Sequence, residues 1–163
     1  MSNFATFLTT TKAKLVASTT LDGAIDDSAP ENHVRLERYV CISKDGPLNH
    51  DALLVHGPLL YLIPAMCDYT PMTMQHAKDE GVLEIDIHSR VSNTTESDFT
   101  KHVTFVDNLC VELMTGADGT GGTSSWLSAT GIKLRCSSAM PEQLSMTEIR
   151  TKVRLKVLLL PAV

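Results

Sequence analysis

The clearest pattern in the sequence is an alternation of apolar and polar residues in the centre of the chain. Apolar residues occupy positions 83, 85, 87 and 91, and the positions between them hold acidic, basic, imidazole and hydroxyl side chains. A period of two, with β-branched residues on the apolar side, is typical of a strand that buries one face. The pattern therefore predicts a strand over Leu83–Val91. Its polar side carries Glu84, Asp86, His88 and Arg90.

After a polar link, the apolar spacing changes to steps of four and three residues, which places one stripe along a helix. This spacing predicts a helix over Phe99–Met114. Thr95 and Asp98 have the spacing of a capping box, Ser97 is a second candidate cap, and Gly116 is expected to end the helix. The residues predicted to face the core are Phe99, Val103, Val106, Cys110 and Leu113.

Shorter patterns predict the remaining elements. Residues 3–17 have apolar positions at helical spacing, and residues 34–42 suggest a first strand. Two short apolar runs, 52–56 and 59–63, predict hairpin strands or one bent strand, because runs of this length favour strand over helix. Lys133 to Cys136 alternates like a strand, and Ile149–Leu159 has the most regular alternation in the chain.

These elements predict one α+β domain spanning residues 1–163. The expected architecture is a mostly antiparallel sheet with two main helices packed on one face, in the order α-β-β-β-α-β-β. Glycine, proline and small polar residues predict mobile loops near residues 22–32, 64–80 and 116–125, and a further loop over 137–145.

Composition and charge narrow the classes of partner. The chain has 163 residues and a net charge of -5, so general attraction to nucleic acid or to anionic membranes is not expected. No apolar run approaches the roughly 20 residues that cross a bilayer, and the first residues do not resemble a secretory signal. Four cysteines without a Cys-x-x-Cys pair predict reduced thiols rather than disulfides.

No catalytic, cofactor-binding or metal-binding residue is assigned from motifs. Gly116, Gly121 and Thr123 have the spacing of a phosphate-binding loop, but Gly122 stands where the lysine is required. No two histidines have the spacing of a zinc site on a helix. Asp86 and His88, with Glu84 beside them and His76 added, form the best metal or acid–base group; the plainer interpretation, which we favour, is a solvent-facing strand whose charges pair with a neighbour.

Basic residues gather near the end of the chain, where residues 131–163 contain six basic and two acidic side chains. If the last two strands are neighbours, these cations line one side of a ribbon. They are then either neutralised by Glu84 and Asp86 or available to an anion or an acidic partner. The residues of this predicted electrostatic surface are Lys133, Arg135, Arg150, Lys152, Arg154 and Lys156.

The arrangement of the starting helix, the apolar hairpin, the central strand and helix and the two closing strands resembles the tail-terminator, or tail-completion, proteins of long-tailed bacteriophages. The resemblance implies a structural, non-enzymatic virion subunit, assembled in the host cytoplasm, that forms a six-fold ring at the head-proximal end of the tail tube. Its implied partners are copies of itself, the tail tube and the neck or head-completion proteins. DNA would pass through the lumen without specific contacts, and neither a membrane nor a cofactor is implied.

Under this resemblance the apolar segment 64–80 is expected to lie between subunits, because such a segment is unfavourable in water. The residues predicted at that interface are Met66, Tyr69, Met72 and Met74. Two alternatives stay open. One is a small metal-dependent or acid–base hydrolase that uses Asp86 and His88, with His76 as a further candidate. The other is a soluble ligand-binding or adaptor domain.

Overall fold

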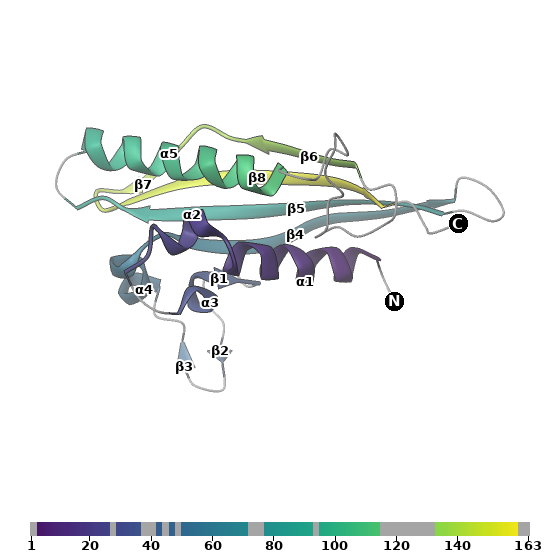
Figure 1. Cartoon of the computed structure of the whole chain (residues 1–163), viewed down its shortest axis with the longest axis horizontal. Coiled ribbons are helices and arrows are strands. Elements are labelled where there is room, and N and C mark those ends of the chain that lie inside the picture. Colours follow the sequence, from purple (N-terminus) through teal and green to yellow (C-terminus); the bar gives the residue numbers. More distant parts are fainter. Residues whose placement is uncertain are drawn as a thin grey trace.

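A six-stranded mixed sheet organises the computed structural model of the chain (Figure 1). The structure describes residues 3–26, 29–36, 42–43, 46–47, 50–71, 77–92, 95–114 and 133–159. The helices are α1 (Asn3–Val16), α2 (Thr19–Asp22), α3 (Pro30–His33), α4 (His50–His56) and α5 (Thr95–Met114). The strands are β1 (Val34–Arg35), β2 (Ile42–Ser43), β3 (Gly46–Pro47), β4 (Leu59–Pro71), β5 (Ala77–Arg90), β6 (Lys133–Ser138), β7 (Glu142–Ser145) and β8 (Glu148–Leu159).

The strands of the main sheet lie in the order β1-β4-β5-β8-β6, and β7 pairs with the beginning of β8. Only the β1–β4 pair is parallel, and the other pairs are antiparallel. β2 and β3 form a separate two-residue hairpin. The predicted fold class, α+β with a mostly antiparallel sheet and two main helices on one face, is confirmed.

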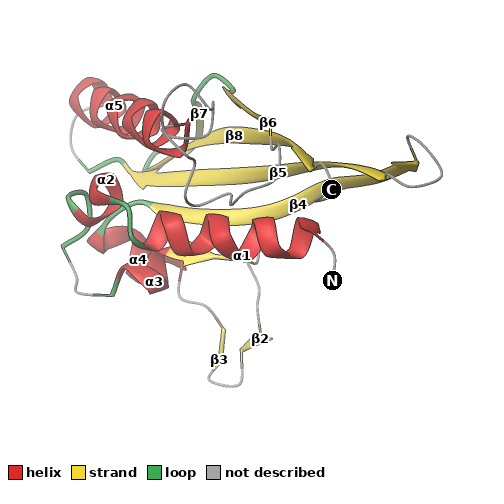
Figure 2. Ribbon diagram, turned by 45° about the vertical axis from the view of Figure 1, so that its right-hand side comes forward, coloured by secondary structure: helices red, strands yellow, loops and turns green. Residues whose placement is uncertain are grey.

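The main core lies between one face of the sheet and the helices α1 and α5, which Figure 2 shows side by side on that face. The apolar positions of β5 point into this core, as their period of two predicts. Ser18 caps α2 and also donates a hydrogen bond to Glu112 of α5 at 2.6 Å, which ties the two helices together. The core includes Phe7, Leu15, Leu21, Leu60, Leu62, Leu83, Ile85, Ile87, Phe105, Leu109, Leu113, Val153, Leu155 and Val157.

A small helix covers part of the opposite face. Leu54 of α4 is buried against Leu59 and Tyr61 of β4, and Leu53 and Ile63 contact the same cluster. The prediction of a strand over residues 52–56 is therefore wrong. The run is amphipathic instead of fully buried, since Leu54 is 6 % exposed and Val55 is 53 % exposed, and an amphipathic helix of two turns fits this pattern.

The predicted loop over 64–80 is also largely wrong, because β4 extends to Pro71 and β5 begins at Ala77. Backbone pairing continues from Met66, opposite Val82, to Pro71, opposite Ala77, with an irregularity between Pro64 and Met66. Proline is tolerated at bulges and sheet edges, so these prolines do not end the strand. Residues 72–76 lie outside the described part.

Smaller differences between the prediction and the structure concern short helices and strands. The predicted loop over 22–32 contains α3, the first strand is limited to Val34–Arg35 before residue 37, and the predicted loop over 137–145 contains β7. The loop 116–125 and the expected helix end at Gly116 lie outside the described residues. Among the described helices, none combines the length and the apolarity needed to cross a bilayer.

Helix α5 is confirmed, but its buried stripe is rotated from the predicted one. Phe99 is 43 % exposed, whereas His102 and Phe105 are buried. The carboxylate of Asp98 accepts a hydrogen bond from the backbone N–H of Ser92 at 2.8 Å, so it fixes the chain that leads into the helix.

Candidate functional site

Two imidazoles and one carboxylate meet on the face of the sheet that α4 covers. His88 Nδ1 lies 2.5 Å from Glu148 Oε1, and His50 Nε2 lies 3.0 Å from the same oxygen. His88 is fully buried, and the side chains of His50 and Glu148 are 16 % and 17 % exposed. One donor atom from each residue lies within 4.8 Å of the other two. We call this group the His–Glu cluster.

Three elements far apart in the sequence build the cluster. His88 is on the polar side of β5, where it is paired with Leu59 of β4 and Arg150 of β8. Glu148 begins β8, and His50 begins α4. Because β4 follows α4 after two residues and pairs with β5, the start of α4 is brought above the ends of β5 and β8.

Tyr61 contacts both imidazoles of the cluster. Its hydroxyl lies 2.6 Å from His50 Nδ1, the ring nitrogen that does not contact Glu148. The Tyr61 ring stacks on His50 and meets His88 edge to face, with ring centroids 5.8 Å and 5.3 Å apart. These contacts fix the orientation of both imidazoles, because each ring is held on more than one side.

Charged residues surround the cluster on the same face. Asp86 is fully buried two positions before His88, and its Oδ2 lies 3.9 Å from Nη1 of Arg150. Arg150 also contacts Glu142 of β7 at 2.6 Å. Burial lowers the pKa of His88 below its ordinary value of 6.5, and the hydrogen bond to Glu148 offsets only part of that effect. The imidazole of His88 is therefore neutral at pH 7, which is the form that binds metals.

The favoured interpretation of Asp86 and His88 as solvent-facing charges is wrong, since both are fully buried. His76, the third candidate, lies outside the described residues. Sequence reasoning missed His50 and Glu148 as members of this group. His50 has no second histidine at the spacing of a metal site on a helix, and Glu148 stands outside the regular alternation of β8.

The strand with Lys133 and Arg135 does lie beside the last strand, with Arg135 of β6 opposite Lys156 of β8 and Lys133 opposite Leu158. Part of the basic surface is neutralised as expected: Arg154 contacts Glu84 of β5 at 2.8 Å, and Arg150 contacts the acids named above. Within the described part of the chain, Lys152 and Lys156 have no ion pair. The strand β8 therefore presents both paired and available cations.

The predicted interface residues divide into two groups. Met66 and Tyr69 are on β4, where they pair in the backbone register with Val82 and Asp79 of β5. Met72 and Met74 lie outside the described residues. The first two are therefore on a paired strand and not in a loop.

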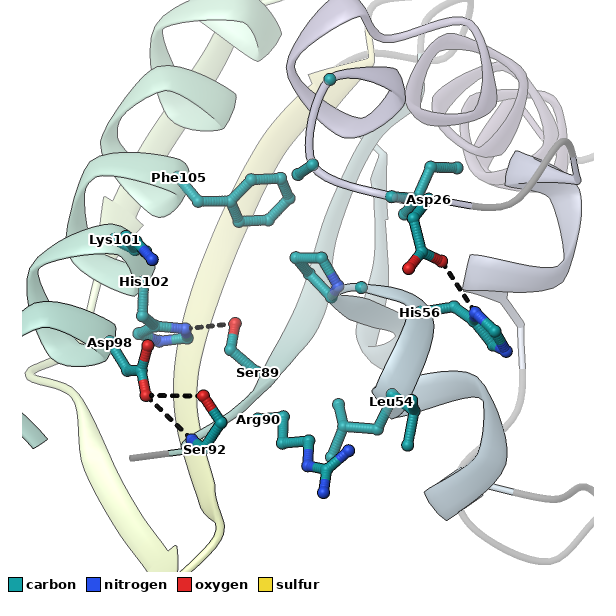
Figure 3. A pocket seen from close by; sticks show the side chains of 16 residues that line it. Asp26, Leu54, His56, Ser89, Arg90, Ser92, Asp98, Lys101, His102 and Phe105 are labelled. Carbon is teal, nitrogen blue, oxygen red and sulfur yellow. Dashed lines mark hydrogen bonds and ion pairs between the residues drawn. The ribbon is translucent and has the colours of Figure 1, made fainter. Parts of the chain in front are cut away.

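A cleft of about 630 Å³ opens elsewhere, between α5, the segment 23–26 that follows α2, and the end of α4 (Figure 3). Asp26 and His56 form one wall and contact each other at 2.7 Å. Lys101 and His102 of α5 form the other wall, and His102 contacts Ser89. The walls carry both signs of charge, and among the predicted cations whose side chains the structure describes, Arg150, Lys152, Arg154 and Lys156, none lines the cleft.

Cys110 of α5 and Cys136 of β6 are both free thiols and contact each other. The hydrogen bond between them and their burial raise the pKa of the Cys110 thiol well above its ordinary value, which disfavours its thiolate. The prediction of reduced cysteines is consistent with this pair.

No protein-family model matches this sequence, and no curated protein matches it. A functional proposal for the chain therefore depends on its own residues and on their arrangement.

Proposed function

We propose that this protein is a structural subunit that assembles head to tail into a ring, of the kind that tail-terminator proteins of long-tailed phages form at the end of the tail tube. The observation that carries the proposal is the open outer edge of β4. β1 pairs with β4 only at Leu60 and Tyr61, and among the described residues no strand pairs with that edge from Leu62 to Pro71.

An unpaired edge exposes a row of backbone N–H and C=O groups, which is a template for pairing with another chain. Pro64 and Pro71 lack the N–H group, so the segment suited to pairing is 65–70. This segment includes Met66 and Tyr69, two of the residues predicted at the interface. Figure 2 shows that the sheet continues here beyond the ends of α1 and α5.

The second edge of the sheet is chemically different, as a ring requires. A ring needs two different surfaces that meet head to tail, whereas a two-fold dimer uses one surface twice. The order of strands puts β4 and β6 toward opposite sides of the sheet. The hairpin of β4 and β5 carries Asp68, Asp79 and Glu80 near its end, and β6 carries Lys133 and Arg135. Opposite charges of this kind favour one register of association over others.

A hydrolase centred on Asp86 and His88 has less support. Both side chains are fully buried, and neither lines the cleft beside α5. A substrate would therefore need a rearrangement of α4 to reach them, whereas the open edge needs none.

The test is the molar mass of the purified chain, measured by light scattering and native mass spectrometry over a range of concentrations, with negative-stain electron microscopy of the largest species. We expect a closed oligomer with a central opening, and we expect six copies. A chain that stays monomeric at every concentration would overturn the proposal.

Charge reversal then tests which edges meet. Asp68→Lys on the outer strand β4, with Asp79→Lys on the neighbouring strand β5, reverses the charge on one side of the sheet. Lys133→Glu with Arg135→Glu on β6 reverses the charge on the other side. Either pair alone is expected to abolish the ring, and the four substitutions together are expected to restore it. Met146→Lys, at an 88 % exposed site in the β7–β8 turn, is the control and is expected to leave the ring intact. If the four-fold variant stays dissociated while the wild type forms rings, the two edges do not face each other.

The assignment to phage tails makes a separate prediction about the gene. Genes for tail-tube and neck proteins are expected on either side of it. Neighbours that encode enzymes of one metabolic route would contradict the tail assignment while leaving ring assembly unaffected.

A further inference from the structure

We infer that His50, His88 and Glu148 bind a divalent transition-metal ion of the zinc class, and that this ion fastens α4 to the sheet. The site is separate from the edges proposed for ring assembly, and it does not depend on them.

The donor set is the first reason. Two imidazole nitrogens and one carboxylate oxygen are a common protein ligand set for Zn²⁺, and imidazole also suits Co²⁺ and Ni²⁺, whereas Ca²⁺ and Mg²⁺ prefer oxygen ligands. The three atoms are His50 Nε2, His88 Nδ1 and Glu148 Oε1, and they converge within 4.8 Å. Each comes from a different element, so the fold rather than a local motif brings them together.

The distances are close to those that a metal needs. Donors about 2.1 Å from a tetrahedral ion lie about 3.3 Å from one another. Glu148 Oε1 is 3.0 Å from His50 Nε2 and 2.5 Å from His88 Nδ1, so the carboxylate must withdraw by less than an ångström. The two imidazole nitrogens lie within 4.8 Å of each other and close on the ion from either side of the carboxylate. Glu148 is able to do so because its side chain is 17 % exposed and only His88 is completely enclosed.

The neighbouring groups orient the ligands as in known metal sites. When Nε2 of an imidazole binds a metal, Nδ1 carries the proton and needs an acceptor. The Tyr61 hydroxyl is at 2.6 Å from His50 Nδ1 and supplies that acceptor. The ring contacts of Tyr61 with both histidines hold them in place before the ion arrives.

The electrostatics favour a cation at this point. Glu148 is partly buried and contacts two imidazoles, and a partly buried carboxylate is stabilised by a positive charge beside it. Asp86, which is buried nearby, already has Arg150 at 3.9 Å. A divalent ion between the two imidazole nitrogens and Glu148 supplies the charge at Glu148.

The role of the ion follows from the position of His50 at the first residue of α4, at the other end of the helix from His56, which contacts Asp26. The apolar cluster under this helix has three buried members, Leu54, Leu59 and Tyr61. Such a small cluster stabilises a seven-residue helix weakly, because short helices depend on their tertiary contacts. A ligand at the first residue of α4 therefore fixes the helix to β5 and β8.

The experiment uses the full chain without a histidine tag. Metal content is measured by mass spectrometry of the elements after purification without chelator. Zn²⁺ and Co²⁺ are then titrated into chelator-treated protein. We expect one Zn²⁺ per chain, the visible absorption of tetrahedral Co²⁺, and a rise in the unfolding midpoint of roughly 5–10 °C when Zn²⁺ is at 100 times its dissociation constant.

Glu148→Gln and His50→Gln keep the size of the side chain and remove a ligand, so both are expected to lose the metal and the shift in midpoint while retaining the circular dichroism of the wild type. His56→Gln is the matched control, because His56 is on the same helix with its side chain 50 % exposed and contacts Asp26 instead. A wild-type chain that binds less than stoichiometric metal would overturn the inference and assign the contacts to a shared proton. Equal binding by Glu148→Gln and the wild type would also overturn it.

Discussion

Lowering the pH from 7 to 5 is expected to destabilise the protein through His102, whose imidazole lies between α5 and the sheet. His102 is 2 % exposed. Its Nδ1 lies 2.7 Å from the Ser89 hydroxyl, and its Nε2 lies 2.7 Å from the Thr151 hydroxyl. Both hydroxyls are able to donate or accept, so these hydrogen bonds suit either protonation state. The loss of water around the ring is therefore the decisive effect.

Burial lowers the pKa of His102 from 6.5 to about 4, and the charge of His88 acts in the same direction. Other charges near His102 are Asp98 and Lys101 on α5 and Arg90 on β5. Because the folded pKa is depressed, the unfolded chain binds the proton first as the pH falls. Stability is therefore fully present above pH 6.5 and is lost as the pH falls toward 4.

The size of the effect follows from the two pKa values. Below both values the loss is about 3 kcal/mol, and between pH 7 and pH 5 it is about 2 kcal/mol. His88, whose pKa is also lowered by burial, adds to the loss in the same direction. The wild-type change therefore exceeds the contribution of His102 alone, and only a comparison with a variant isolates that contribution.

The assay is urea unfolding at pH 7 and pH 5, with the free energy of unfolding compared between wild type and His102→Gln. The glutamine keeps a polar group near Ser89 and Thr151 but does not titrate. We expect the pH-dependent loss to be smaller in His102→Gln by about 2 kcal/mol, whatever the stability of the variant at pH 7. His56→Gln, at an exposed histidine, is expected to keep the wild-type difference. Equal losses in wild type and His102→Gln would refute the argument from burial.

Two further predictions concern the fold. Gly57 has φ +150°, and an added Cβ would lie 2.6 Å from Ile25 Cγ2 and 2.8 Å from the Ala24 carbonyl oxygen. Gly57→Ala is therefore expected to lower the free energy of unfolding by about 1–3 kcal/mol. Gly23→Ala, at φ -72°, is the control for urea unfolding and is expected to stay within about 1 kcal/mol of wild type. Leu109→Ala in α5 is expected to cost about 2–5 kcal/mol because its side chain is 1 % exposed. Val111→Ala, at 67 % exposure on the same helix, is expected to change the unfolding free energy by no more than about 0.5 kcal/mol, and a similar loss in both variants would contradict the assigned core.

The periodicity of apolar residues was sufficient to predict the long helices and strands. β5, α5 and β8 each have a sustained pattern of one period, and each forms as predicted. It failed for residues 52–56, because a run of five residues fits a buried strand and one side of a helix equally well. Phe99 shows a related limit: its apolarity fits the stripe, but the chain entering α5 leaves its ring 43 % exposed.

The His–Glu cluster could not be predicted from the spacing of its residues in the sequence, for a physical reason. His88 and Glu148 are 60 residues apart, and His50 and Glu148 are 98 residues apart. Only the pairing of β5 with β4 and β8 brings the three together. The alternation of β5 correctly put Asp86 and His88 on one side. It contained no information that α4 covers that side, so burial of the two residues could not be predicted from it.

The two sides of β5 also make its alignment with its neighbours difficult to mistake. A shift of the β5 register by one residue would place Asp86 and His88 in the apolar core beneath α1 and α5. It would also place Ile85 and Ile87 on the face with Glu148 and Arg150. Both exchanges are unfavourable, and they occur together. Misalignment of the central strand therefore carries a double penalty, which favours a single pairing of β5 with its neighbours.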